Sequence, residues 1–180
     1  MRYHNITKDD MLNGDGLRVV LWLSGCEHRC PECQNPVTWD IDGGLSFDEA
    51  AKQEVFDELD KDYISGITFS GGDPLHPANR AEVGEMIAEI KQKYPNKTIW
   101  MYTGYNWEDL QNLPYLSSVD VLIDGRFISK LKDNQLCWRG SSNQRVINVR
   151  ESIKHGRVVL WVKDEKAVEY TVLEGCQCSA

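Results

Sequence analysis

Short apolar segments alternate with amphipathic helical segments along most of this 180-residue chain. The first apolar segment, residues 17–23, reads Leu-Arg-Val-Val-Leu-Trp-Leu and is typical of a strand that is covered on both faces. Further strands are predicted at 67–70, 99–102, 119–123, 145–149 and 157–162. Strands that are separated by helices predict a parallel sheet with right-handed crossover connections.

Two helices are predicted between the first three of these strands. The first spans 46–60, because Ser46 and Glu49 form a capping box and apolar residues recur at every fourth position. The second begins near Pro77, which suits the first turn of a helix. Pro95 ends it, because proline cannot continue a helix.

The chain length limits how many βα units can form. A closed eight-unit barrel typically takes about 250 residues, so a chain of 180 residues predicts five or six units instead. We expect an α/β fold, an open partial (β/α) barrel of five to six parallel strands, with a doubly wound sheet as the alternative. Residues 1–175 are expected to form one domain and residues 176–180 a short cysteine-containing tail. In either architecture the functional residues lie at the carboxyl ends of the strands.

Composition narrows the class of function. Twenty Lys and Arg against 28 Asp and Glu give a net charge of −8, which argues against nucleic acid as a partner. No apolar run approaches the roughly 20 residues that span a bilayer, so no membrane association is expected. The N-terminal residues lack the apolar core of a signal peptide, which predicts a cytoplasmic protein. Its six cysteines should then stay reduced. The clustering of three of them predicts a metal-binding or redox role.

Three of the cysteines fall within eight residues, directly after the first predicted strand. Cys26, Cys30 and Cys33 have the spacing C-x3-C-x2-C, and thiolates are ligands for zinc, copper(I) and iron–sulfur clusters. A closed zinc site needs four ligands, the fourth of which could be His28 or come from the two cysteines of the tail. A 4Fe-4S cluster held by three cysteines instead leaves one iron open to a substrate or cofactor. Spacing alone leaves both interpretations open.

Motifs elsewhere in the chain resemble those of radical S-adenosylmethionine (SAM) enzymes. The segment 13–18 is similar to the glycine-rich lead-in of the enzymes that activate glycyl-radical proteins. The segment 70–77, Ser-Gly-Gly-Asp-Pro-Leu-His-Pro, resembles their SAM-binding turn. Three more segments are similar to the branch of these enzymes that acts on anaerobic ribonucleotide reductases: 102–105, 124–127 and 138–144. The resemblance covers residues 3–144.

This resemblance implies a cluster and a cofactor. Cys26, Cys30 and Cys33 would each hold one iron of a 4Fe-4S cluster, and the amino and carboxylate groups of SAM would chelate the fourth iron. The SAM-binding residues that the resemblance implies come from the cysteine loop and the glycine turn: Glu32, Cys33, Gln34, Gly71, Gly72 and Asp73. Taken alone, Gly-Gly-Asp-Pro is also ordinary sequence for a tight strand-to-helix turn.

The resemblance also implies the reaction and the partners. One electron would cleave SAM to methionine and a 5′-deoxyadenosyl radical, which abstracts hydrogen from a glycine of the reductase, so no side chain need act as a catalytic acid or base. The implied partners are the large catalytic subunit of an anaerobic ribonucleoside-triphosphate reductase and an electron donor such as reduced flavodoxin. Tyr102, Arg126 and Arg139 are candidates for contact with the cavity or with the partner.

Three positions depart from the family pattern. Glu32 stands where many radical SAM enzymes have an aromatic residue, and Asp15 stands where the activating enzymes often have proline. Asp73 stands where the wider superfamily often has glutamate. None of these departures removes a cluster ligand. Two other functions remain as alternatives: a small radical SAM enzyme that acts on a free purine-like metabolite, and a zinc-binding interaction module.

The remaining histidines and cysteines have plainer interpretations. His28 is expected to be solvated or to support the cluster ligands, and His76 to lie at a helix entry. Cys137 is expected to behave as a small buried apolar residue. Cys176 and Cys178 lie in a polar tail, for which we expect flexibility and no essential role.

Overall fold

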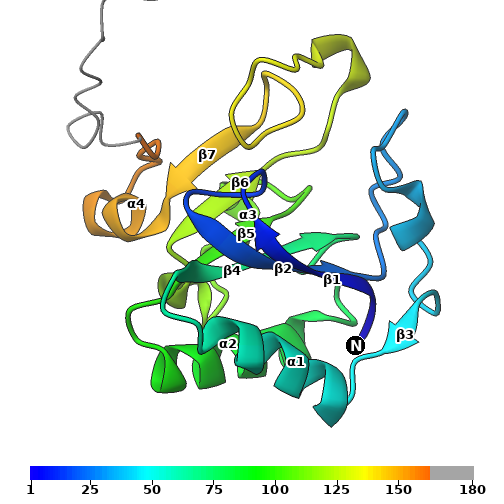
Figure 1. The fold of residues 1–180 in the computed structure, drawn as a ribbon. Helices are drawn as coiled ribbons and strands as arrows, with labels where there is room; N and C mark the ends of the chain where they lie inside the picture. Colours follow the sequence, from blue (N-terminus) through cyan, green and yellow to red (C-terminus); the bar gives the residue numbers. More distant parts are fainter. Residues whose placement is uncertain (163–180) are drawn as a thin grey trace, which may run out of the picture.

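A seven-stranded mixed β-sheet organises residues 1–162, the part of the chain that the computed structural model describes (Figure 1). Its strands are β1 (Arg2–Asp10), β2 (Leu17–Leu23), β3 (Leu45–Ser46), β4 (Ile64–Gly71), β5 (Thr98–Tyr102), β6 (Val121–Asp124) and β7 (Arg145–Asn148). The α-helices are α1 (Glu49–Leu59), α2 (Arg80–Lys93), α3 (Trp107–Leu110) and α4 (Val149–His155). Short 3-10 turns occupy Pro36–Thr38, Leu116–Ser118 and Ser129–Leu131. The predicted α/β class is confirmed.

The strand order β3-β1-β2-β4-β5-β6-β7 places the parallel strands in the middle of the sheet. β2, β4, β5 and β6 run parallel, whereas β1, β3 and β7 are antiparallel to their neighbours. The prediction of five to six parallel strands is therefore wrong in number, since four strands are mutually parallel within the described residues. The edge strands β3 and β7 do not pair with each other there, so the sheet is open. β1 escaped prediction because Ile6 is its one buried residue.

The main core lies between the sheet and the helices α1 and α2, which cover one face of it (Figure 1). Alternate residues of each central strand point toward these helices. In the register of β2 with β4, Val19 lies opposite Ile67 and Leu21 opposite Phe69, and all four side chains are fully buried. Burial on both faces explains why the strand at 17–23 reads as a continuous apolar run.

The other face of the sheet carries a smaller core around Trp100 of β5. Trp100, Trp138 and Trp161 pack edge to face, with ring centroids 4.9 to 5.3 Å apart. The guanidinium of Arg18 lies 5.3 Å from the Trp100 ring and is fully buried. Among the described residues its hydrogen-bond acceptors are neutral oxygens of Asp15, Ile67, Thr68 and Thr98. Burial lowers the pKa of Arg18 to about 10, so the side chain stays charged at neutral pH.

Helix α1 begins later than the sequence predicts. Its N-cap is Asp48, whose carboxylate accepts a hydrogen bond from the backbone N–H of Ala51 at 3.0 Å. Ser46, the predicted cap, lies in β3, and its hydroxyl accepts a hydrogen bond from Arg2 at 3.1 Å. Serine and aspartate are comparable caps, so the pairing of β3 with β1 decides between them.

Helix α2 likewise begins at Arg80, three residues after Pro77. Asn79 occupies the N-cap position, but its side chain does not cap the helix. Its amide instead donates hydrogen bonds to the backbone carbonyls of Ser24 and Asp73, at 2.8 and 3.2 Å. Asn79 therefore joins the entry of α2 to the end of β2 rather than serving the helix itself.

The C-terminal part of the described chain differs from the prediction. The expected strand at 157–162 is reduced to one isolated bridge between Ile147 and Leu160. Helix α4 was not predicted; it ends at Gly156, whose φ of 63° is the left-handed conformation that commonly terminates helices. The tail at 176–180 lies outside the described residues. No helix in residues 1–162 is long and apolar enough to cross a membrane.

We predict that Asp48→Ala lowers the free energy of unfolding by about 1 kcal/mol, because it removes the N-cap hydrogen bond of α1. Ser46→Ala is the matched control and should change it by less than about 0.5 kcal/mol, because its hydrogen bond to Arg2 is exposed. Urea unfolding of the full chain measures both. If Ser46→Ala lowered the free energy of unfolding more than Asp48→Ala does, the capping box predicted from the sequence would be correct after all.

Candidate metal centre

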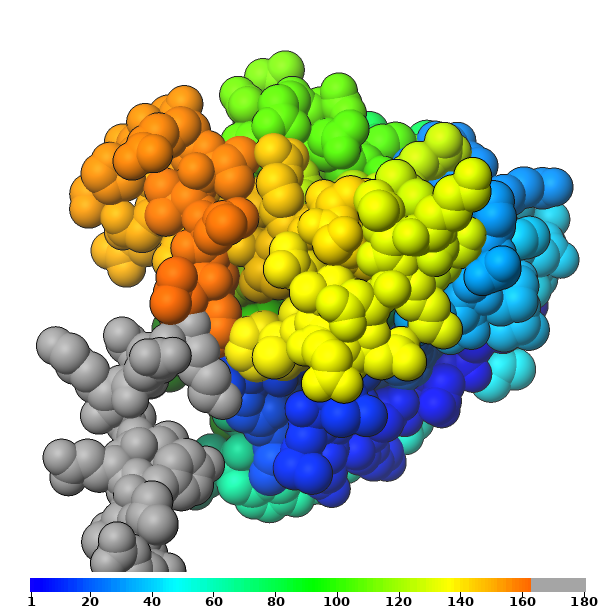
Figure 2. All heavy atoms as spheres, turned by 90° about the horizontal axis from the view of Figure 1, so that it is seen from above, coloured from blue at the N-terminus to red at the C-terminus, as the bar shows by residue number. Residues whose placement is uncertain are grey.

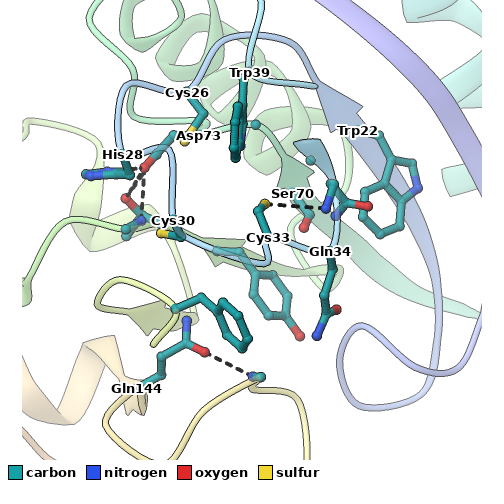
Figure 3. A pocket seen from close by; sticks show the side chains of 18 of the residues that line it. Trp22, Cys26, His28, Cys30, Cys33, Gln34, Trp39, Ser70, Asp73 and Gln144 are labelled. Atoms are coloured by element: carbon teal, nitrogen blue, oxygen red, sulfur yellow. Dashed lines mark hydrogen bonds and ion pairs between the residues drawn. The ribbon is translucent and has the colours of Figure 1, made fainter. Parts of the chain in front are cut away.

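A cavity opens at the carboxyl ends of β2, β4, β5 and β6 (Figure 3), the edge at which parallel sheets place functional residues. The cavity has a volume of about 180 Å³ and is open to solvent. Four segments of the chain form most of its wall: 26–39, 70–73, 102–104 and 125–144. Asn13, between β1 and β2, and Trp22 of β2 complete it. Figure 2 shows the last of these stretches (yellow) lying beside the cysteine loop (light blue) on the surface.

Cys26, Cys30 and Cys33 all line this cavity with free, half-buried thiols. The cysteine loop, residues 24–34, is fixed at its start by the segment that follows it. The N–H of Gly25 donates to the carbonyl of Thr38 at 2.8 Å, and the N–H of Cys26 donates to the carbonyl of Trp39 at 3.1 Å. These two bonds fix the first thiol at the end of β2.

The second and third cysteines are each preceded by a residue in the left-handed region. Arg29 has a φ of 46° and Glu32 a φ of 59°, values that are uncommon for residues with side chains. Each such turn redirects the chain directly before a cysteine, and both Cys30 and Cys33 then line the cavity. The Sγ of Cys33 also accepts a hydrogen bond from the N–H of Asn35 at 3.4 Å.

Asp73 is buried, and its carboxylate is surrounded by hydrogen-bond donors. It accepts from the N–H of Leu75 at 2.9 Å within its own turn. From the segment after β5 it accepts from the hydroxyl of Thr103 at 2.9 Å and from the N–H of Gly104 at 2.9 Å. From the cysteine loop it accepts from Nε2 of His28 at 2.8 Å. Asp73 thus joins the ends of β2, β4 and β5.

His28 is held on every side. While Nε2 donates to Asp73, its Nδ1 accepts from Arg126 at 3.3 Å, so the proton lies on Nε2. The carbonyl of His28 accepts a second bond from Arg126 at 3.0 Å. The ring packs edge to face on Tyr105, 4.6 Å away, and a Cβ at Gly104 would lie 2.3 Å from it. This agrees with the expectation of a supporting rather than a ligating role.

Gly71 and Gly72 are required by close packing of backbone. Gly71 has a φ of 98°, and a Cβ there would lie 2.7 Å from the backbone of Leu23 in β2. A Cβ at Gly72 would lie 2.5 Å from the carbonyl oxygen of Gly25 and 2.8 Å from that of Thr38. The turn therefore packs directly on the cysteine loop, and both glycines also line the cavity.

Gln144 organises the loop on the opposite wall. Its Oε1 accepts from the N–H groups of Gly140 and Ser141, at 3.0 and 3.2 Å, while its Nε2 donates to the carbonyl of Gly125 at 2.9 Å. Arg139 donates to the carbonyl of Gln144 at 2.7 Å. These bonds hold the loop against the end of β6 and beside the cysteine loop.

Most of the predicted site residues lie in the cavity wall: Cys26, Cys30, Cys33, Gln34, Gly71, Gly72, Asp73 and Tyr102. Glu32 is exposed and does not line it, and neither do Arg126 and Arg139. Arg139 lies instead in a separate groove with Cys137. Cys137 is exposed, so the expectation of a buried apolar residue is wrong. Cys176 and Cys178 lie outside the described residues.

Three aromatic residues of the wall were missed: Trp22, Trp39 and Phe127. Trp22 could have been found, because strand alternation places it on the face away from α1 and α2. Its indole N–H donates to the hydroxyl of Thr7 at 2.7 Å. Trp39 and Phe127 follow no periodic pattern. Tyr102 shares the wall, and burial raises its pKa, which keeps its hydroxyl protonated.

The donor set fits a polynuclear cluster. No three Cys, His, Asp or Glu side chains in residues 1–162 are placed to hold one metal ion, and both ring nitrogens of His28 are engaged. Three thiols around one cavity suit a cluster, whose irons occupy separate corners. Burial raises the pKa of the Cys26 thiol, but binding to iron would deprotonate it.

Comparison with known proteins defines the class first. The model of the 4Fe-4S single cluster domain family matches residues 12–147, so the chain carries such a domain. An anaerobic ribonucleoside-triphosphate reductase-activating protein of Enterobacteria phage T4 is 44% identical over 146 residues, which cover 81% of this chain and 93% of the relative. The protein of that name from Escherichia coli K12 is 40% identical over 154 residues, covering 83% of this chain and 100% of the relative. The chain belongs to the family of anaerobic ribonucleoside-triphosphate reductase-activating proteins.

We predict that His28→Ala weakens retention of the cluster without abolishing it. The change removes one of four donors from the buried Asp73 carboxylate, which typically costs about 1–3 kcal/mol, and it removes one of the two hydrogen bonds between the loop and Arg126. His28→Gln is the control, because its amide can still donate a hydrogen bond. Iron release to a chelator and urea unfolding, both under anaerobic conditions, measure the effect. Complete loss of iron would instead identify His28 as a ligand.

Proposed function

We propose that this protein activates an anaerobic ribonucleoside-triphosphate reductase by means of a 4Fe-4S cluster and SAM. The observation that carries the proposal is the convergence of three motifs on one cavity: the cysteine loop, the turn 70–73 and the loop containing Gln144. The names of the relatives from phage T4 and Escherichia coli support the reductase as the target. Neither a free purine-like metabolite nor a zinc module accounts for those relatives.

In this proposal Cys26, Cys30 and Cys33 hold three irons and leave the fourth open to the amino and carboxylate groups of SAM. The backbone carbonyls of Gly71 and Gly72 accept hydrogen bonds from the SAM ammonium, because both residues line the cavity. The carboxylate of Asp73 already accepts hydrogen bonds from four protein donors. Its role is therefore to position the turn that carries Gly71 and Gly72, and not to contact SAM. Gln34 adds a polar group to the wall beside Cys33, whereas Glu32 lies at the exposed edge of the loop.

A 4Fe-4S cluster held by these cysteines would supply the single electron needed to cleave the C–S bond of SAM, which would give methionine and a 5′-deoxyadenosyl radical able to take a hydrogen atom from a glycine of the reductase. The chain's own residues orient the reactants and exclude water. Trp22, Trp39 and Phe127 supply apolar surface around the reacting groups. The neutral hydroxyl of Tyr102 adds no charge to the wall.

The open sheet suits access by a large partner. β3 and β7 leave the described sheet unclosed, and the loop of Arg139 and Gln144 forms part of the rim of the cavity through Gly140 and Gln144. We assign the large catalytic subunit of the reductase to this rim and reduced flavodoxin as the electron donor. The proposal includes one domain over residues 1–175, a cytoplasmic location, and no nucleic-acid or membrane partner.

We predict that the anaerobically reconstituted protein holds one 4Fe-4S cluster per chain and releases 5′-deoxyadenosine from SAM when reduced. With the purified large subunit it should produce a glycyl-radical signal in electron paramagnetic resonance. Alanine at Cys26, Cys30 or Cys33 should abolish all three results, whereas Cys137→Ala should not, because that thiol is exposed outside the cavity.

Two outcomes of this experiment would contradict the proposal. Colourless protein with stoichiometric zinc would favour an interaction module. SAM cleavage without any radical on the reductase would favour a small-molecule substrate.

We predict that Arg139→Ala leaves SAM cleavage intact but slows glycyl-radical formation by about tenfold, because it loosens the rim loop through its bond to the Gln144 carbonyl. Lys154→Ala removes the same charge from α4, away from the cavity, and should change neither rate. The two rates are measured in parallel on each variant. Unchanged radical formation with Arg139→Ala would remove this loop from the partner surface.

A further inference from the structure

Two hydroxyl groups lie side by side on the sheet surface that forms the floor of the cavity, those of Ser70 and Tyr102 (Figure 3 labels Ser70). β4 and β5 run parallel with Phe69 opposite Met101, so the next residue of each strand, Ser70 and Tyr102, also lies beside the other. Phe69 and Met101 point into the main core. Because side chains alternate along a strand, Ser70 and Tyr102 point to the opposite face, where both line the cavity.

Both hydroxyls are open to the cavity and bond to no protein group in residues 1–162. Four side-chain polar atoms of this part of the chain are enclosed without a hydrogen-bond partner, and neither hydroxyl is among them. An unpartnered atom that is not enclosed has accessible surface, and the cavity is the space that both residues line. Burial of the ring raises the pKa of Tyr102, so its hydroxyl stays neutral.

Most other polar side chains of the wall are already hydrogen bonded within the protein. Asp73 accepts from His28 and Thr103, and Gln144 bonds to backbone groups of its own wall. The indole N–H of Trp22 donates to Thr7. The hydroxyls of Ser70 and Tyr102 are therefore the side-chain groups of the central strands that remain able to bind a ligand.

The position of these hydroxyls differs from the position proposed for SAM. In the proposed function SAM is held at the cysteine loop and by the carbonyls of Gly71 and Gly72. Ser70 precedes Gly71, and one residue along a strand is about 3.3 Å, so the two hydroxyls lie deeper in the cavity than those carbonyls. A glycine that gives up a hydrogen atom must come next to SAM, and the deeper floor is a surface against which it can lie.

The chemistry of a glycine segment fits two neutral hydroxyls. Such a segment brings backbone N–H and C=O groups into the cavity, and removing them from water is unfavourable unless new hydrogen bonds form. A hydroxyl can both donate and accept, so Ser70 and Tyr102 can each serve either backbone group.

We propose that the hydroxyls of Ser70 and Tyr102 bind the backbone of the reductase segment that contains the reacting glycine. This inference rests on the proposed function and deepens it, because it names the side chains that recognise the protein substrate inside the cavity. They position the glycine and leave the binding of SAM to the cysteine loop and the glycine turn.

The test uses Tyr102→Phe and Ser70→Ala, each of which removes one hydroxyl. Three quantities are measured on the cluster-loaded full chain: the dissociation constant of SAM, that of the purified large subunit with SAM present and the cluster oxidised, and the amount of 5′-deoxyadenosine released per glycyl radical after reduction. Each variant should weaken binding of the large subunit about tenfold and leave that of SAM unchanged. Release of 5′-deoxyadenosine per glycyl radical should rise, because the glycine is held less well.

Tyr63→Phe and Ser65→Ala are the matched controls. They make the same two changes at the amino end of β4, away from the cavity, and should alter none of the three quantities. Since neither Ser70 nor Tyr102 gives its hydroxyl to a protein partner in residues 1–162, both variants should unfold in urea as the wild type does. If one of them is destabilised, the other carries the test from the neighbouring strand.

Two results would overturn the inference while the proposed function stands. In one, SAM binding weakens at least as much as binding of the large subunit, which would assign the hydroxyls to SAM. In the other, neither variant changes binding of the large subunit or the amount of 5′-deoxyadenosine per glycyl radical. If the wild-type protein forms no glycyl radical on the reductase, the proposed function itself fails.

Discussion

The arrangement of the cavity depends on the hydrogen bonds that the buried carboxylate of Asp73 accepts. Parallel strands are not joined by hairpin turns at their carboxyl ends, so the loops there need other contacts to fix them relative to one another. Asp73 provides these contacts by accepting hydrogen bonds from His28 after β2 and from Thr103 and Gly104 after β5. An unpaired buried charge is costly. Movement of any of these donor segments away from Asp73 would therefore be unfavourable.

A second buried carboxylate repeats this arrangement one strand further along the sheet. Asp124, at the end of β6, accepts from the N–H of Trp107 at 2.8 Å and from Arg145 of β7 at 3.0 Å. Asp73 and Asp124 therefore hold the segment between β5 and α3 from both sides. The two carboxylates are stabilised by different groups. Asp124 forms an ion pair with Arg145. Asp73 accepts hydrogen bonds from neutral N–H and hydroxyl groups and from the ring of His28.

The sequence was most informative where a single segment determines its own environment. The central strands were predictable because burial on both faces demands a continuous apolar run, and the cysteines and glycines because their spacing is local. β1 was missed because it exposes polar residues while its backbone pairs with β2 and β3. The role of Asp73 depends on contacts between segments that are distant in the chain, which no local pattern encodes. The predicted start of α1 at Ser46 was wrong for the same reason, because Ser46 pairs with the distant strand β1.

Asp73 and Glu32, two departures from the pattern of the radical SAM enzymes that the sequence resembles, are explained by this geometry. The side chain of Asp73 is short enough to accept from Leu75, two residues on in its own turn, as aspartate commonly does. That bond turns the carboxylate toward the protein, so the proposed binding of the SAM ammonium depends on the carbonyls of Gly71 and Gly72. Glu32 is exposed and adds nothing to the cavity wall. Trp39 and Phe127 bring aromatic surface to the same cavity from other segments.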